Sequence, residues 1–323
     1  MNIGSYDFDI EGARSKLEDI GAKKILLQLP DGLRHRSEDF RRKFDQEVRL
    51  WGGSCYGACD LPSDIGDCDA LVHIGHARIP NLDIDYEVIY LPGKSTRFVE
   101  VPQELFDKLK GKVALYATAQ HLHQLEDMSK IISEKGHKTV IGEGDDRIES
   151  KGQVLGCDYS SAVKDADTHV YLGTGRFHPL GLSFALETDV LMYNPSTGDI
   201  SMIDEKERDR FLRKRFAAIS LIKDASKIGI IVSKKTGQNR MKTAEELLEL
   251  GEKLGKEMMI IELDEIDKRS IDDFDVEGII NTACPRIALD DAENYDTLLL
   301  TPEEFEIAIG KKEWDDWEAD QLD

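Results

Sequence analysis

The 323-residue sequence contains no apolar run that approaches the roughly 18 residues needed to span a bilayer. Its first eleven residues also lack the basic segment and the apolar segment of a secretory signal. We therefore expect a cytoplasmic protein that makes no membrane contact.

The sequence has no excess of positive charge. It carries 42 Lys and Arg against 64 Asp and Glu, which gives a formal net charge of −22. Binding to a nucleic-acid backbone requires basic surface, so this composition argues against nucleic acid as a partner. An acidic surface is compatible with a basic protein partner, although solubility alone also explains it.

Cysteine is scarce, with five residues in the whole chain. An odd number in a long chain without an export signal argues against a disulfide framework. We expect free thiols, metal ligands or a catalytic thiol instead.

Two of these cysteines, Cys59 and Cys157, lie in segments that resemble each other at an offset of 98 residues. The residues that match at this offset are Asp60 with Asp158, Ser63 with Ser161, Asp67 with Asp165, Asp69 with Asp167, Val72 with Val170, Gly75 with Gly173 and Arg78 with Arg176. Cys284 also follows an apolar run and precedes an acidic, helix-like stretch, residues 285–296. The pattern suggests a repeated unit that supplies one thiolate per copy.

Short apolar runs alternate with segments of helical spacing along the whole chain, which indicates an α/β fold with mainly parallel sheets. The order restarts twice, so we predict three similar domains at 1–105, 106–200 and 201–323. The first two match by residue and the third by element order. No low-complexity linker separates them, which suggests that they pack together into one body. We expect the three units to have a pseudo-threefold arrangement. We also expect a short helix over 60–67 and an exposed or frayed tail from Trp314.

Three thiolates at the carboxyl ends of strands could converge on one metal centre. Cys59, Cys157 and Cys284 would suit a [4Fe–4S] cluster with one iron left open for a substrate. A zinc ion with three cysteines and water is also allowed, and the alternative is that all three are ordinary buried cysteines. Cys55 and Cys68 have no counterparts in the other units and are left out of this set.

Other polar residues are candidates for ligand contacts. Gly173, Gly175 and His178 follow a predicted strand and would admit a nucleotide or an adenosyl group, or form only a turn. Gln238 and Arg286 could hold a carboxylate or amide beside the metal, although a surface salt bridge also explains the arginine. The histidines at 73, 76, 121 and 123 do not have the spacing of a metal site as a set.

Several longer runs resemble the diphthamide synthase family, in particular its archaeal subunit-2-type enzymes. They are Leu29-Pro30-Asp31-Gly32-Leu33, Tyr56-Gly57-Ala58-Cys59-Asp60-Leu61, Gly156-Cys157, Gly173-Thr174-Gly175-Arg176-Phe177-His178-Pro179 and Cys284-Pro285-Arg286. The resemblance covers essentially the whole chain. It implies three similar four-stranded α/β domains around a [4Fe–4S] cluster held by Cys59, Cys157 and Cys284, and a homodimer.

The same resemblance implies the activity of a 2-(3-amino-3-carboxypropyl)histidine synthase, the first step of diphthamide biosynthesis. A cluster reduced by an electron donor would cleave the Cγ–S bond of S-adenosylmethionine. The 3-amino-3-carboxypropyl radical would then add to C2 of a histidine of elongation factor 2. No catalytic side chain beyond the cluster ligands is implied. The alternative is a non-catalytic adenosyl- or nucleotide-binding scaffold with a structural metal.

Overall fold

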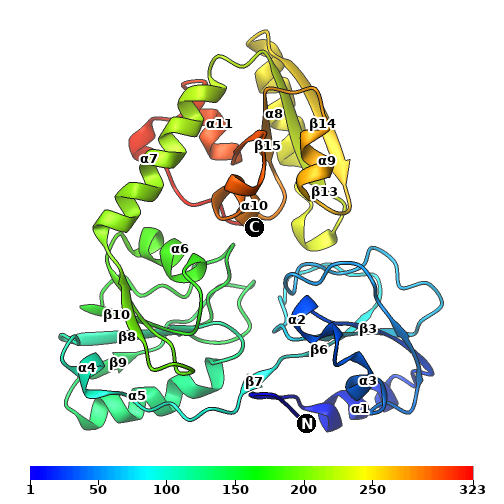
Figure 1. The fold of residues 1–323 in the computed structure, drawn as a ribbon, viewed down its shortest axis with the longest axis vertical. Coiled ribbons are helices and arrows are strands. Elements are labelled where there is room, and N and C mark those ends of the chain that lie inside the picture. The colour runs from blue at the N-terminus through cyan, green and yellow to red at the C-terminus, as the bar shows by residue number, and fades with distance from the viewer. Residues whose placement is uncertain (323) are drawn as a thin grey trace. The chain divides into compact units, whose positions relative to one another are not determined.

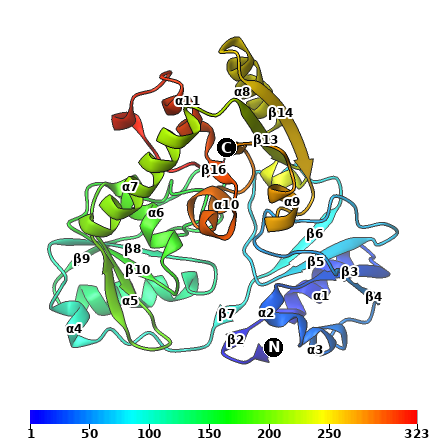
Figure 2. The ribbon, with the colours of Figure 1, turned by 45° about the horizontal axis from the view of Figure 1, so that its top comes forward.

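Three sheets that share a core of four parallel strands in the same order make up most of the fold, and the computed structural model describes residues 1–322. The first sheet has the order β4-β3-β5-β6, with β3 (Lys24–Gln28), β4 (Glu47–Leu50), β5 (Ala70–Ile74) and β6 (Glu87–Leu91) (Figure 2). The second has β12-β11-β10-β8-β9, with β8 (Lys112–Ala117), β9 (Lys138–Val140), β10 (Thr168–Leu172), β11 (Val190–Tyr193) and β12 (Ile200–Ile203). The third has β14-β13-β15-β16, with β13 (Lys227–Ser233), β14 (Glu257–Leu263), β15 (Gly278–Asn281) and β16 (Leu298–Leu300) (Figure 1). The predicted α/β class with mainly parallel sheets is confirmed.

The repeat is visible in its ion pairs as well as in its strand order. Each first strand begins with a lysine whose Nζ lies 2.7–2.8 Å from an aspartate that precedes the third strand: Lys24 with Asp67, Lys112 with Asp165 and Lys227 with Asp275. Two residues after each of these aspartates, the backbone N–H donates to the carbonyl of the same lysine, at 2.8–3.0 Å. The third copy therefore matches the other two more closely than its sequence indicates.

The central strands are buried because both faces of each sheet are covered. Every residue of β5, β10 and β15 is buried, as expected for a parallel sheet between helical layers. The helices are α1 (Ile10–Asp19), α2 (Asp31–Arg34), α3 (Ser37–Arg41), α4 (Gln103–Phe106), α5 (Leu125–Glu134), α6 (Phe177–Leu186), α7 (Glu205–Ile222), α8 (Met241–Lys253), α9 (Lys268–Asp272), α10 (Pro285–Leu289) and α11 (Pro302–Ala308). Residues 1–322 also contain four 3₁₀ turns, η1 (Leu122–Gln124), η2 (Thr236–Gln238), η3 (Ala292–Asn294) and η4 (Trp314–Asp316).

Local sequence explains where several of these elements begin and end. Pro30 and Asp31 end the strand β3 and open α2, because proline cannot donate to the sheet. Thr301 begins α11 through a reciprocal capping box with Glu304, and Pro302 occupies the first helical turn. Helix α8 presents Ala244 and Leu247 to β13 and β14, one turn apart on its buried face.

Some features differ from the expectations. A fifth strand, β12, extends the second sheet, and a small antiparallel sheet is formed by β1 (Asn2–Ile3), β2 (Tyr6–Asp7) and β7 (Lys94–Ser95). The predicted helix over 60–67 is wrong, because this segment forms turns in which Gly66 adopts a positive φ of 63°.

The chain divides into two compact units. The N-terminal unit comprises residues 1–154, 160–174 and 191–202, and the C-terminal unit comprises residues 155–159, 175–190 and the chain from 203 onward. The domain boundaries at 105 and 200 stay a prediction. No helix within residues 1–322 is long and apolar enough to cross a membrane.

Candidate metal centre

The Cys59 loop is held across the end of strand β3 by one buried amide. Gln28, the last residue of β3, donates from Nε2 to the carbonyls of Ser54 and Asp60, at 2.8 and 2.7 Å. The Asp60 carboxylate accepts from the Ser54 hydroxyl and from the Tyr56 backbone N–H, at 2.9 and 2.8 Å. These bonds tie both ends of the loop together, so they fix the backbone that carries the half-buried Cys59.

Cys157 lies at the tip of a tight turn in the C-terminal unit. The turn is closed by reciprocal backbone bonds between Leu155 and Asp158, at 3.0 and 3.4 Å. The cysteine is buried, and its carbonyl accepts a 3.0 Å bond from the N–H of Leu322.

Cys284 is the residue that precedes α10, directly after β15 in the C-terminal unit. Asn281 donates from its side-chain amide to the carbonyl of Cys284, at 2.9 Å, and accepts from the N–H of Ala283. Pro285 then opens the helix, since its fixed φ suits a first helical position. The half-buried cysteine is therefore presented on a short, fully hydrogen-bonded corner.

The C-terminal tail connects the segments that carry Cys157 and Cys284. Gln321 accepts from the N–H of Tyr159, and Asp320 forms an ion pair with Arg240 at 2.7 Å. Arg240 also donates to the carbonyls of Thr282 and Ala283, at 2.8 and 3.1 Å. Residues 320–322 are therefore bonded directly to the Cys157 segment and, through Arg240, to the Cys284 segment. The expected exposure of the tail is seen just before them, at Asp315, Asp316 and Glu318. No motif in the sequence indicates this pairing.

An aromatic contact joins the same two segments. The Arg286 guanidinium lies 4.9 Å from the ring centre of Phe177, and the ring packs on Gly156, where a Cβ would be 2.3 Å from it. His178 follows on α6, and its pKa is lowered to about 4, mainly by burial and further by the charge of Arg286. The structure thus places the predicted site residues Arg286 and His178 in the neighbourhood of Cys157 and Cys284, within one unit.

The remaining predicted contact residues lie at strand ends. Gly173 follows β10 with a φ of 154°, and its N–H donates to the Tyr193 carbonyl, as Gly75 does to Leu91 in the first repeat. Because both repeats share this backbone geometry, it explains the glycine at position 173 without a bound ligand. Gly175, at φ 77°, lies in the following loop. Gln238 is buried in η2, which follows β13 at the same sheet edge as Cys284. Cys59 belongs to the N-terminal unit.

The three cysteines are not at equivalent positions of the repeat. Cys59 and Cys157 follow the second strand of their repeats, β4 and β9, whereas Cys284 follows the third, β15. The residue at the position of Cys284 in the first repeat is His76, because the register pairs β3 with β5 as it pairs β13 with β15. The predicted equivalence therefore holds for two cysteines and not for the third.

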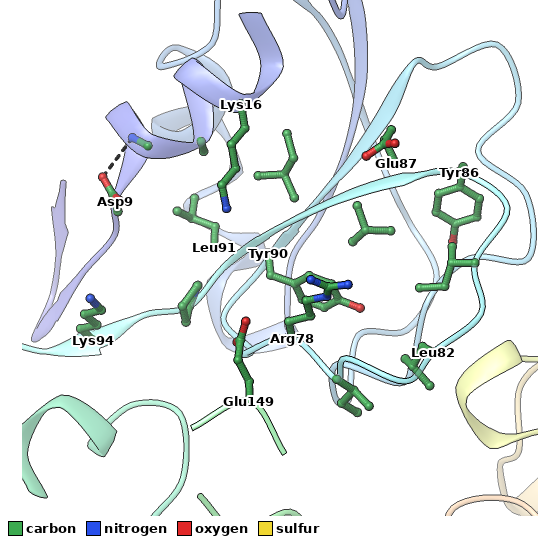
Figure 3. A pocket seen from close by; sticks show the side chains of 17 residues that line it. Asp9, Lys16, Arg78, Leu82, Tyr86, Glu87, Tyr90, Leu91, Lys94 and Glu149 are labelled. Carbon is green, nitrogen blue, oxygen red and sulfur yellow. Dashed lines mark hydrogen bonds between the residues drawn. The ribbon is translucent and has the colours of Figure 1, made fainter. Parts of the chain in front are cut away.

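A pocket of about 560 Å³ lies beside the first sheet in the N-terminal unit (Figure 3). Its wall includes Arg78, Glu149 and Tyr90, and the Tyr90 hydroxyl donates to the carbonyl of Ala58 at 3.4 Å. Burial, followed by the charge of Cys59, raises the pKa of Tyr90. Tyr90 thus contacts both this pocket and the Cys59 loop, and none of the predicted site residues lines the pocket.

One group of possible metal ligands was not predicted from the sequence. The ligand atoms of Cys55, His73 and His76 all lie within 4.8 Å of one another. Two of the residues come from the end of β5, and the third comes from the loop that carries Cys59. The His-x-x-His spacing was the available signal, but the cysteine that completes the group lies 18 residues before His73 in the sequence.

The family model described as "Putative diphthamide synthesis protein" matches residues 29–318. Among curated proteins, a 2-(3-amino-3-carboxypropyl)histidine synthase from Pyrococcus horikoshii is 38% identical over 318 residues, covering 95% of this chain and 91% of that protein. An enzyme of the same name from Methanocaldococcus jannaschii is 28% identical over 330 residues, covering 94% of this chain and 90% of that protein.

The solved structures extend this similarity to three dimensions. A crystal structure of Dph2 from Pyrococcus horikoshii with a 4Fe-4S cluster superposes with a TM-score of 0.88 at 37% identity. The alignment covers 98% of this chain and 94% of that one. A second crystal structure of Dph2 from the same organism gives the same TM-score at 36% identity.

Proposed function

The chain belongs to the diphthamide synthesis protein family, and from this premise we propose that it is a 2-(3-amino-3-carboxypropyl)histidine synthase. The observation that supports the proposal most is the set of three cysteines that form no disulfide, Cys59, Cys157 and Cys284, each on a short loop with hydrogen-bonded ends. These loops present thiols without using them in disulfides.

The donor set fits a [4Fe–4S] cluster. Thiolates are the usual ligands of such clusters, and three of them would leave one iron open to a substrate. We propose that Cys59, Cys157 and Cys284 hold it. When bound, the cluster would supply the electron that cleaves the Cγ–S bond of S-adenosylmethionine.

The chain's own residues would bind and orient the substrate. Arg286 is held against Phe177 and paired with Asp290 at 2.6 Å, close to Cys284, where it could receive the carboxylate of the aminocarboxypropyl group. Burial keeps His178 neutral at physiological pH, so it would act there as a hydrogen-bonding group and not as a second cation. Gln238, Gly173 and Gly175 remain predicted contacts.

The net reaction is redox-neutral. The C2 hydrogen of a histidine imidazole is replaced by the 3-amino-3-carboxypropyl group, and methylthioadenosine and a proton are released. The electron donor primes the centre but is not consumed in the balance. We propose that the histidine belongs to elongation factor 2. We also propose that the enzyme acts as a homodimer and that the reaction takes place in the cytoplasm.

The proposal is tested by product analysis of anaerobically prepared, reduced protein supplied with S-adenosylmethionine and the factor. We expect methylthioadenosine and a modified histidine, and iron and sulfide in the protein. Cys284→Ser should abolish both the product and most of the iron, whereas Cys68→Ser, a buried cysteine outside the set, should retain both.

Two results would contradict the proposal. Formation of 5′-deoxyadenosine would show that a different bond is cleaved. Zinc without iron in the purified protein, with Cys284→Ser changing stability alone, would favour the non-catalytic scaffold.

A further inference from the structure

The N-terminal unit contains a second set of metal-binding side chains besides Cys59. Cys55 and His73 are buried and His76 is half-buried, and one ligand atom from each falls within 4.8 Å of the others. We propose that Cys55, His73 and His76 bind a divalent metal ion at a site separate from the proposed cluster. The ion that we expect there is zinc. One sulfur and two imidazole nitrogens form a donor set that suits zinc.

The hydrogen bonds around His73 set its tautomer. Gln28 donates from Nε2 to two backbone carbonyls, so its Oε1 must face His73 and accept from Nδ1, at 2.7 Å. Nε2 of His73 is then unprotonated, and its lone pair accepts a hydrogen bond from Nδ1 of His76. A ligating histidine in proteins is commonly oriented by such a bond from its other nitrogen.

The second imidazole lies directly against this lone pair. Nε2 of His73 is 2.9 Å from Nδ1 of His76. Two nitrogens on a tetrahedral zinc ion, each about 2.0–2.1 Å from it, lie about 3.3 Å apart. An ion between them therefore needs the two nitrogens to separate by a few tenths of an ångström and both rings to tilt so that their lone pairs converge on the ion. The proton on Nδ1 of His76 would move to its other nitrogen.

The position of His76 in the repeat independently indicates a ligand. His76 occupies in the first repeat the place that Cys284 occupies in the third, at the end of the corresponding strand. The same backbone corner thus carries a metal-ligand residue type in both copies. Burial lowers the pKa of His76 to about 4, so the imidazole is neutral and able to ligate at physiological pH.

The thiol of Cys55 completes the site and supplies its only sulfur ligand. Burial raises the pKa of Cys55 to about 12, so without a metal this side chain is a neutral thiol. Metal binding would displace its proton, as it does for other cysteine ligands. A water molecule would complete the four-coordinate geometry that zinc prefers.

The test uses the full chain, loaded anaerobically with iron and sulfide, equilibrated with Zn²⁺ and desalted before metal analysis. We expect one zinc per chain in the parent and in Cys68→Ser, and loss of that zinc in Cys55→Ser and His76→Gln. Cys68 is the matched control because it is a buried cysteine of the same unit, packed against Leu61 and Leu71. Circular dichroism and melting without metal show whether each variant is folded.

Co²⁺ supplies a readout that does not depend on the proposed cluster. In a Cys59→Ser background, Co²⁺ should give a thiolate-to-cobalt charge-transfer band that the additional Cys55→Ser change removes. Equal zinc in Cys55→Ser and the parent, or no zinc in the parent, would overturn the site. Iron content and methylthioadenosine formation are measured on the same samples, so failure of this site and failure of the proposed function are distinguishable.

Discussion

At the scale of single residues, a buried ion pair between Arg215 and Glu304 joins α7 to α11. Arg215 donates from Nε to Glu304 at 2.7 Å, and its other nitrogens donate to the carbonyls of Ala288 and Leu299, both at 2.8 Å. Side-chain exposure is 6% for Arg215 and 0% for Glu304. Glu304 also caps α11 through Thr301, so one carboxylate serves two elements.

We predict that Arg215→Ala lowers the free energy of unfolding by about 3–5 kcal/mol, because it leaves the buried Glu304 carboxylate without its charged partner. The neighbouring ion pair provides the control: Lys214 and Glu293 are exposed, and Lys214→Ala should cost no more than about 1 kcal/mol. Urea unfolding of the two variants measures the difference. Equal losses would show that the pair at 215 is not buried in solution.

At the scale of elements, helix α6 determines where the Cys157 turn lies. Gly181 faces the ring of Tyr159, and a Cβ at this position would be 1.9 Å from the tyrosine hydroxyl oxygen. Tyr159 is 4% exposed and its N–H is bound by Gln321. The absence of a side chain at 181 therefore lets the helix approach the segment that carries Cys157.

Gly181→Ala should lower the free energy of unfolding by about 1–3 kcal/mol, since the overpacking cost exceeds the gain in helix propensity. It should also reduce the iron retained by the loaded protein, because Tyr159 lies two residues from Cys157. Gly32→Ala is the control: a Cβ there meets nothing within 4 Å, and its stability should be unchanged or slightly higher. Retention of full stability and iron by Gly181→Ala would contradict the prediction.

At the scale of the whole molecule, burial of histidines makes stability depend on pH. Burial lowers the pKa of six of the eight histidines, namely His73, His76, His121, His123, His169 and His178. In the unfolded chain, histidine takes up a proton below about pH 6.5, whereas the folded chain resists protonation. The stability these neutral side chains give is present above that pH and is lost as the pH falls.

We expect the free energy of unfolding to decrease from pH 6.5 to pH 4, with His178 contributing up to about 1.4 kcal/mol per pH unit. The decrease should end near pH 4, because the pKa of His178 in the folded protein is about 4. His178→Gln should flatten this part of the profile, and His35→Gln, a change at an exposed histidine, should not. Urea titrations at half-unit pH steps give the slopes, and parallel profiles for the parent and His178→Gln would refute the assignment.

The alternation of apolar and helical segments determined the α/β class and the positions of most long elements. Strand β13 at Lys227–Ser233 is a short apolar run and helix α7 at Glu205–Ile222 is a long charged stretch, and such signals depend only on neighbours along the chain. The sequence did not predict the short strands, which include β12 and the sheet of β1, β2 and β7. Strands of two to four residues have too few positions to show a period.

The sequence by itself also singled out Cys59, Cys157 and Cys284, because a scarce residue after an apolar run is visible without coordinates. Only the tertiary structure decided that Cys284 follows the third strand of its repeat, that the tail at 320–322 joins two cysteine segments, and that Cys55 meets His73 and His76. The reason is that parallel strands bring distant residues to a shared edge through register and crossovers. Which side chains meet at that edge depends on hydrogen bonds such as those of Gln28, which no local pattern records.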